Sequence, residues 1–155
     1  MRLVRSTDTK PELLVRRITH GMGFRYRLHA RDLPGVPDLV FRSKKKAIFV
    51  HGCFWHGHNC RLARTPKSHV TYWVHKIARN SERDALNQQK LSHLNWDCLV
   101  LWECELKDET ALAQTIRSFL NESIAPLKEG PIGGKEQNDV RAVRNAVDKS
   151  QRKAH

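Results

Sequence analysis

The sequence lacks any long apolar run, and this absence excludes membrane-spanning proteins. Its 155 residues have a mean hydropathy of −0.61, whereas a membrane-spanning helix needs about 20 consecutive apolar residues. Residues 1–10 also lack the apolar stretch of a secretory signal peptide. We therefore expect a cytoplasmic protein. The length predicts one domain with a core of ordinary size, because a chain near this length buries about 70% of its unfolded surface.

Acidic residues are few relative to basic ones. Lys and Arg number 28 against 16 Asp and Glu, which gives a formal net charge of +12. Charge of this sign attracts phosphate polyanions and releases their counterions on binding. The charge therefore favours a nucleic-acid partner. The alternatives are a basic protein kept soluble by its charge and a protein that touches a membrane surface.

Cysteine is scarce as well, with four residues in the chain. A reducing cytosol disfavours disulfides, so metal ligation or burial is the expected use of these thiols. Two of them lie in the segment 51–60, which holds three His and two Cys in ten residues. This density is far above what the composition would give by chance and makes the segment the first candidate for a site.

Cys53, His58 and Cys60 have the ligand chemistry of tetrahedral zinc and are close enough for one loop to wrap the ion. Cys104, just past an expected strand at 98–102, would supply the fourth ligand. Four protein ligands leave no open position, so such a zinc would be structural. The alternative is a set of buried reduced cysteines with surface histidines. Cys98 lies within an apolar run, and we interpret it as a core residue.

The chain divides into a body and a tail. Residues 126–134 are rich in Pro and Gly and poor in side chains that could pack. Residues 128–155 carry 7 basic and 4 acidic residues, a net charge of +3. We expect a folded body over 1–127 and a basic, flexible tail over 128–155.

Helix and strand patterns alternate along the body. Thr9-x-x-Glu12 is a capping-box pattern, which predicts a helix that ends near Gly21. Short apolar runs predict buried strands at 39–41, 47–50 and 98–102, and apolar residues at helical spacing predict helices over about 70–94 and around 112–120. The order predicts an α/β fold in a single domain, with a central mixed β-sheet flanked by helices.

An aspartate and two histidines remain as candidate catalytic groups. Asp38 begins one expected strand and His51 ends the next, so two adjacent strand ends would place them side by side. His56 lies in the segment that carries the zinc ligands. An Asp that holds Mg²⁺ and a His that moves protons together indicate metal-assisted phosphodiester hydrolysis. Taken singly, each is more often a turn residue or a surface histidine.

Aromatic residues occur where a core would not place them. Phe54 and Trp55 lie in a polar, metal-clamped turn, from which rigid rings could wedge between base pairs. Trp73 lies on the apolar stripe of the expected long helix, which offers it a place in the core. Trp96 and Trp102 we interpret as core residues.

Basic residues gather in two places. The run at 42–46 lies in an expected turn between strands and is either a solvated tip or a phosphate clamp. On the long helix, four residues at spacings of three and four would form one face along a DNA backbone: Lys76, Arg79, Asn80 and Arg83.

Together, Pro37-Asp38, the string from Phe49 to Cys60 and Trp102-Glu103-Cys104 resemble the very-short-patch repair (Vsr) endonuclease family. The likeness covers about residues 1–120, and its most specific part is HGCFWH. It implies a fold like that of PD-(D/E)xK nucleases. It also implies Mg²⁺-dependent nicking of one DNA strand 5′ to the thymine of a T·G mismatch that arises when 5-methylcytosine deaminates. The alternatives are an inactive, zinc-stabilised DNA-binding module and a restriction-type nuclease on matched DNA.

The resemblance also assigns catalytic roles. Asp38 would bind Mg²⁺ with the backbone carbonyl of Val50, which stands where the family commonly has Thr, and with His51. His56 would be the general base for the attacking water, and Glu12 would support the active site. The structural zinc ligands implied by the family are the four chosen above: Cys53, His58, Cys60 and Cys104.

The remaining implied contacts are with DNA. Phe54, Trp55 and Trp73 match residues that intercalate beside the mismatch, and Met1 matches a methionine that inserts from the other side. The basic arm that precedes this methionine in the family is not part of the sequence. Lys76 and Asn80 match positions that contact DNA. We expect a monomer whose partner is mismatched duplex DNA, with contacts to other mismatch-repair proteins.

Overall fold

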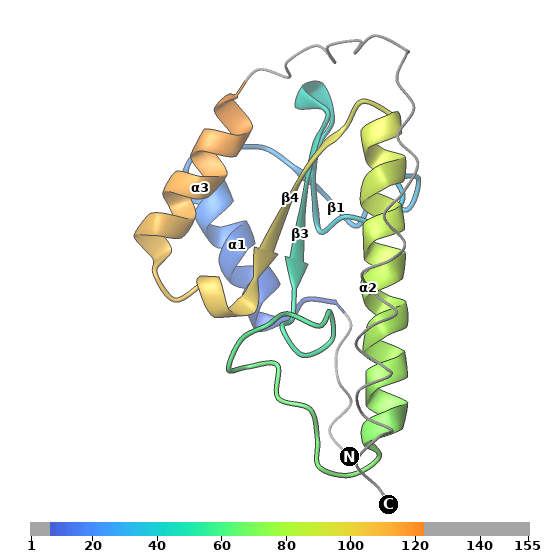
Figure 1. Cartoon of the computed structure of the whole chain (residues 1–155). Helices are drawn as coiled ribbons and strands as arrows, with labels where there is room; N and C mark the ends of the chain where they lie inside the picture. The colour runs from blue at the N-terminus through green and yellow to red at the C-terminus, as the bar shows by residue number, and fades with distance from the viewer. Residues whose placement is uncertain (1–6, 123–155) are drawn as a thin grey trace, which may run out of the picture. The chain divides into compact units, whose positions relative to one another are not determined.

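Helices and strands alternate along residues 7–122, the part of the chain that the computed structural model describes (Figure 1). The elements, in order, are α1 (Lys10–Gly21), β1 (Arg27–Leu28), β2 (Leu39–Phe41), the 3-10 turn η1 (Arg42–Lys44), β3 (Lys46–His51), α2 (Val70–His93), β4 (Asp97–Trp102), the 3-10 turn η2 (Glu103–Glu105) and α3 (Glu109–Asn121). Met1 and the expected tail at 128–155 lie outside the described residues. No helix in the described part of the chain is both long and apolar enough to cross a membrane.

Helix α1 begins as its sequence predicts. Thr9 is the N-cap, and its hydroxyl accepts from the backbone N–H of Glu12 at 3.5 Å. The same hydroxyl donates to Glu12 Oε1 at 2.9 Å. A capping interaction of this kind is worth about 1 kcal/mol. It also holds the Glu12 carboxylate at the start of the helix, which bears on the site described below.

The four strands form a mixed sheet in the order β1-β2-β3-β4. Strand pairs β1–β2 and β2–β3 are antiparallel, whereas β3–β4 is parallel with His51 opposite Trp102. The three expected strands are confirmed. Strand β1 was not predicted, because it has only two residues, both exposed, and no apolar run marks it. The start of β2 and the ends of β3 and β4 meet at one edge of the sheet.

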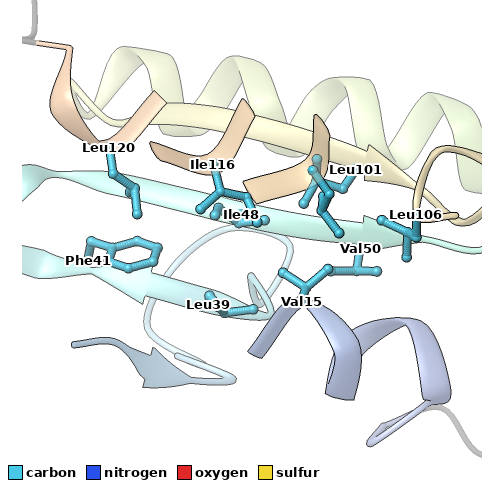
Figure 2. Close-up of a cluster of buried hydrophobic side chains, with 10 residues drawn as sticks. Val15, Leu39, Phe41, Ile48, Val50, Leu101, Leu106, Ile116 and Leu120 are labelled. Atoms are coloured by element: carbon cyan, nitrogen blue, oxygen red, sulfur yellow. The ribbon is translucent and has the colours of Figure 1, made fainter. Parts of the chain in front are cut away.

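Helices cover both faces of this sheet. Helices α1 and α3 pack on one face over a cluster of buried side chains (Figure 2): Val15, Leu39, Phe41, Ile48, Val50, Leu101, Leu106, Leu112, Ile116 and Leu120. On the other face lie Ala30, Leu33, Val40, Phe49 and Leu91, the last from α2. Strand β3 is buried over its whole length, which explains its continuous apolar run, since alternate residues enter opposite clusters.

Helix α2 covers the sheet with its C-terminal part only and extends past the edge where β3 ends (Figure 1). Leu91 is its one buried residue. Val70 and Val74, on the apolar stripe that predicted the helix, are 48% and 53% exposed. The stripe therefore marks a helix whose first half is free of the core and available for other contacts.

The basic run at 42–46 is exposed over residues 42–45 and buried at Lys46, so it is not a fully solvated tip, and its use as a phosphate clamp stays a prediction. Lys46 is 2% exposed, and its ammonium donates to the carbonyl oxygens of Phe119 and Glu122 at the end of α3. Arg42 pairs with Asp32 at 2.7 Å. Cys98 and Trp96, both expected in the core, are partly buried against the cluster on the α2 face.

Candidate active site and metal centre

A cleft of about 750 Å³ opens at the edge where β3 ends. Its lining includes every catalytic residue expected from the sequence, together with Val50: Glu12, Asp38, Val50, His51 and His56. Helix α2 supplies a wall of the cleft through Arg83, Asp84, Asn87 and Gln88. Side chains from α1, the sheet and α2 thus meet in one hollow.

Asp38 is held at the start of β2 by the neighbouring strand. Its Oδ2 accepts from the backbone N–H of Val50 at 2.7 Å, and its own N–H donates to Ile48 O at 3.1 Å. Burial raises the pKa of Asp38 to about 6, and the negative charge of Glu12 adds to this, although the Val50 N–H opposes it. A cation bound at this position would offset the negative charge of the Asp38 carboxylate.

The turn before Asp38 is pressed against α2. A Cβ on Gly35, whose φ is +77°, would lie 3.0 Å from Asn87 Cβ and 3.2 Å from the Phe49 ring. Only glycine meets both the backbone and the space requirement. Val36 has a φ of +50°, which is rare for a β-branched residue, and it lines the cleft. The approach to Asp38 is therefore fixed by contact with two elements.

Glu12 is 5% exposed, and both oxygens of its carboxyl group have partners. It accepts from the Asp8 N–H at 2.9 Å and pairs with Arg16 at 3.2 Å. Arg16 also donates to Asp8 at 2.6 Å and lies 3.0 Å from His29 Nε2. An arginine has no acceptor, so His29 Nε2 must accept this bond. Three side chains here could together hold a metal ion: Asp8, Glu12 and His29. The guanidinium of Arg16 contacts all three and already provides the positive charge that a metal ion would bring.

The two candidate catalytic histidines stack on each other. The ring centroids of His51 and His56 are 3.9 Å apart with 7° between their planes. Burial, then the positive charge that His56 can carry, lower the pKa of His51 to about 4. His51 is therefore neutral at pH 7. His56 Nδ1 lies 2.5 Å from Asp84 Oδ2.

Asp84 is a candidate functional residue that the sequence reasoning missed. It lies in α2, 28 residues after His56, and nothing local marks it as a partner of a histidine. The one available signal is its spacing of four from Asn80, which places it on the polar helix face predicted to follow DNA. Its carboxylate fixes the His56 ring and leaves Nε2 to face the cleft. The ligand atoms of His51, His56 and Asp84 also lie within 4.8 Å of one another, so this trio is able to hold a cation.

The four expected zinc ligands come together beside the cleft. The ligand atoms of Cys53, His58, Cys60 and Cys104 all lie within 4.8 Å of one another, and Cys104 Sγ is 3.4 Å from His58 Nδ1. A tetrahedral zinc would separate its sulfur and nitrogen ligands by about 3.5–3.8 Å, so the donor set and its spacing fit this ion. All four cysteines of the chain are free thiols. We refer to these four residues as the Cys/His cluster.

The thiols of the Cys/His cluster differ in acidity. Burial raises the pKa of Cys53 to about 12. At Cys60 burial acts in the same direction, but the backbone N–H of Leu62 and hydrogen bonds with Cys53 and His58 outweigh it and lower the pKa to about 7. Metal binding would displace the protons that remain, so occupancy should depend on pH.

An aromatic cluster lies between the loop after β3 and the exposed half of α2. Phe54 packs on Trp55 and Trp73 with centroid distances of 5.0 and 5.3 Å, and Tyr72 lies 5.1 Å from Trp73. The ammonium of Lys76 lies 5.5 Å from the Trp73 ring centroid and 5.6 Å from those of Trp55 and Tyr72. Trp73 therefore joins the loop aromatics. Tyr72, 56% exposed, is an addition that the sequence reasoning missed.

Two contacts seat the loop on α2. Asn80 donates to the carbonyl of Trp55 at 2.9 Å. Gly57 has a φ of +69°, and a Cβ there would lie 2.8 Å from Ile77 Cγ2. Asn80 thus has a partner within the protein, and its expected contact with DNA stays a prediction, as does that of Lys76.

Trp102 corrects the expectation of a plain core residue. It is half-buried at the end of β4, and its ring stacks on His58 at 4.3 Å with 10° between planes. It meets His51 edge-on at 5.3 Å. It lies between the Cys/His cluster and the cleft because the β3–β4 register pairs it with His51.

Comparison with known proteins agrees with this geometry. A family model described as DNA mismatch endonuclease Vsr matches residues 1–62. The chain is 48% identical over 123 residues to the type II nicking enzyme V.XorIIP of Xanthomonas oryzae pv. oryzae, covering 79% of this chain and 90% of that one. It is 40% identical over 119 residues to V.NmeAIP, a type II nicking enzyme of Neisseria meningitidis, with 77% and 85% covered.

A third relative is named for mismatch cleavage. The DNA mismatch endonuclease Vsr of Escherichia coli is 38% identical over 112 residues, which are 72% of each chain. With three relatives matched over most of their lengths, this chain belongs to the Vsr family of endonucleases.

Proposed function

We propose that this chain nicks one strand of duplex DNA 5′ to the thymine of a T·G mismatch and so initiates very-short-patch repair. The observation that carries the proposal is one cleft that gathers an aspartate, a buried glutamate and a stacked histidine pair, close to an aromatic cluster. The relatives support it, because one is named a mismatch endonuclease and others nicking enzymes. We also propose that the sheet with Pro37-Asp38 at its edge is of the PD-(D/E)xK type.

Asp38 is the residue proposed to hold Mg²⁺. One of its oxygens is engaged by Val50 N–H, which leaves the other for a metal. The mutual repulsion of Asp38 and Glu12 would be relieved by a dication, so the residues present fit the ion. His51 and the Val50 carbonyl are the other proposed ligands. When bound, Mg²⁺ would neutralise charge on the scissile phosphate and polarise its oxygens.

His56 is the proposed general base. Its Nδ1 faces Asp84, so Nε2 can take a proton from the attacking water while the Asp84 carboxylate stabilises the resulting imidazolium. His51 stays neutral because burial depresses its pKa. Its ring can therefore remain stacked on a protonated His56 without a second positive charge.

The aromatic cluster is the proposed mismatch probe. Rings of Phe54, Trp55 and Trp73 seated on a rigid helix can unstack a base step, and a mismatched step costs less to open than a paired one. The ammonium of Lys76 lies against these rings. On binding, it would leave the rings and contact DNA instead. The exposed side chains of Arg79 and Arg83 would contact phosphates.

The Cys/His cluster is proposed to hold a structural zinc, which would join the loop after β3 to the end of β4 without a position open to substrate. We further propose that the enzyme acts as a monomer in the bacterial cytoplasm and contacts other mismatch-repair proteins.

A strand-resolved nicking assay tests the function. Two end-labelled duplexes would differ only in carrying T·G or T·A at one site, in several sequence contexts, with Mg²⁺ or with EDTA. We expect a nick 5′ to the mismatched T, none on the T·A duplex and none in EDTA. Equal cutting of both duplexes would indicate a restriction-type nuclease. Tight mismatch binding without cutting would indicate an inactive DNA-binding module.

A further inference from the structure

We propose that Trp102 is a positioning residue that couples the Cys/His cluster to His51, so that filling the cluster with a metal sets the orientation of the catalytic histidine pair. The role of His51 in this inference rests on the proposed nicking function. The coupling itself is a property of the fold and is measurable without DNA.

The sheet register creates the contact. Strands β3 and β4 are parallel, and their last paired residues are His51 and Trp102. Beyond this pair one strand leads into the loop that carries three residues of the Cys/His cluster, and the other leads to Cys104. The indole therefore contacts His58 of the cluster and His51 of the cleft.

The ring contacts form an unbroken series. His58, a member of the Cys/His cluster, stacks face to face on Trp102 at 4.3 Å, and Trp102 meets His51 edge-on at 5.3 Å. His51 stacks on His56 at 3.9 Å, and His56 is fixed by Asp84. One end of the series is held by α2 through Asp84. The other end of the series is His58. The position of His58 depends on its contact with Cys104 and on any metal that these two residues share.

The stacked geometry gives the Trp102 indole a role beyond filling space. A ring 10° from parallel with His58 and 77° from the plane of His51 restricts rotation of both imidazoles, because either would clash with the indole on turning. A branched aliphatic side chain of smaller size would remove this restraint on His51, while the stacking of His51 on His56 would remain. Since a displacement of about 1 Å in a catalytic group can cost 10²-fold in rate, the position of the indole bears on chemistry that it does not touch.

Two substitutions separate positioning from simple packing. Trp102→Leu removes the ring but keeps an apolar side chain, and Trp102→Phe keeps a smaller ring in the same plane. Trp96→Leu is the matched control: Trp96 is also a partly buried tryptophan, next to the start of β4, but it packs on the α2 face of the core. All variants would be compared as full-length protein, metal-free and after addition of one zinc per chain.

The first readout is the NMR signal of the imidazole ring protons in histidine-labelled protein without DNA. In the unsubstituted protein, adding zinc to the metal-free form should shift the signals of both His58 and His51. Trp102→Leu should retain the His58 response and lose that of His51, Trp102→Phe should give an intermediate shift, and Trp96→Leu should behave as the parent. A His51 response that survives in both Trp102 variants would overturn the proposal.

The second readout is single-turnover nicking of the T·G duplex at saturating DNA. Trp102→Leu should lower the rate about 10- to 100-fold with mismatch affinity little changed, and Trp102→Phe should recover most of it. Equal rates in Trp102→Leu and Trp96→Leu would also overturn the proposal. If the unsubstituted protein nicks no T·G duplex, the proposed function fails while the NMR comparison still decides the coupling. Should Trp102→Leu fail to fold, Trp102→Phe carries the NMR readout, and a full parental His51 shift in that variant would overturn the proposal.

Discussion

At the scale of single residues, the candidate site brings charges together at a cost to stability. Asp38 is half-buried near the Glu12 carboxylate, and burial, with repulsion from Glu12 adding to it, raises the pKa of Asp38 to about 6. The folded protein therefore binds a proton at Asp38 more tightly than the unfolded chain does. By linkage, the contribution of Asp38 to the free energy of unfolding falls as the pH rises from about 4 to about 6.

Asp38→Asn should therefore separate catalysis from stability. The amide oxygen can still accept from Val50 N–H, but the charge that a metal needs is gone, so T·G nicking should fall by at least about 100-fold. In EDTA at pH 7 the variant should be more stable than the parent by about 1–2 kcal/mol, allowing for partial exposure. Urea unfolding at pH 7 and at pH 4 measures this.

The gain should vanish at pH 4, where the parent's carboxyl is protonated too. Mismatch binding serves as the control and should be retained. A variant that is less stable than the parent at pH 7, or that nicks at the parental rate, would contradict the assignment of Asp38.

Asp84→Asn tests the carboxylate that orients His56. An amide can present its oxygen to Nδ1–H, but it lacks the charge that stabilises an imidazolium, and it can rotate to donate and so favour the wrong tautomer. We expect the single-turnover rate to fall about 10²- to 10⁴-fold, with little change in DNA affinity. Glu82→Gln, an exposed acid on the same helix, is the matched control. The assignment would be lost if both variants nicked equally well.

At the scale of elements, the close fit of the loop after β3 against α2 decides whether the aromatic cluster has a fixed position. At Gly57 the loop backbone lies close to the Ile77 side chain, since a Cβ would lie 2.8 Å from Ile77 Cγ2. Asn80 closes the other contact through the Trp55 carbonyl. These two contacts hold the loop against α2 and restrict its conformation.

Gly57→Ala should loosen this contact between the loop and α2. The substitution places a methyl group against Ile77 and forces a residue with a side chain to a φ of +69°, which together should destabilise the protein by about 1–3 kcal/mol. Mismatch binding should weaken more than binding to matched DNA. Gly21→Ala is the control, because a Cβ there meets nothing within 4 Å. Thermal unfolding and binding titrations measure both, and equal effects of the two variants would argue against a tight loop–helix contact.

Much of this arrangement could be predicted from sequence because its signals are local. The cap at Thr9, the apolar strands and the His- and Cys-rich segment each sit within about ten residues. Asp84, Tyr72 and Trp102 could not be assigned, since their roles depend on where α2 crosses the sheet edge and on the β3–β4 register. A tryptophan in an apolar strand is interpreted as a core residue until its neighbour across the sheet is known to be a candidate catalytic histidine.

At the scale of the whole molecule, the Cys/His cluster joins two parts of the chain that the sheet leaves separate. Three of its members come from the loop after β3 and one from η2, directly after β4. The hydrophobic clusters on the two faces of the sheet include none of its residues. The core should therefore survive loss of the metal, whereas the loop should not keep its form.

Cys60→Ala tests this division. Cys60 is the thiol whose pKa hydrogen bonds lower to about 7, so it is the first to offer a thiolate, and its loss should reduce zinc from one ion per chain to less than about a tenth of that. We expect the far-UV spectrum to be nearly unchanged, because the helices and the sheet do not depend on the loop, while protease cutting within 52–69 becomes rapid and T·G nicking is lost. Cys98→Ala, which removes a thiol packed outside the Cys/His cluster, should keep zinc and activity and lose only packing energy. A Cys60→Ala protein that retains zinc and nicks DNA would show that the cluster does not hold the loop, whereas global unfolding would show that the core depends on the metal after all.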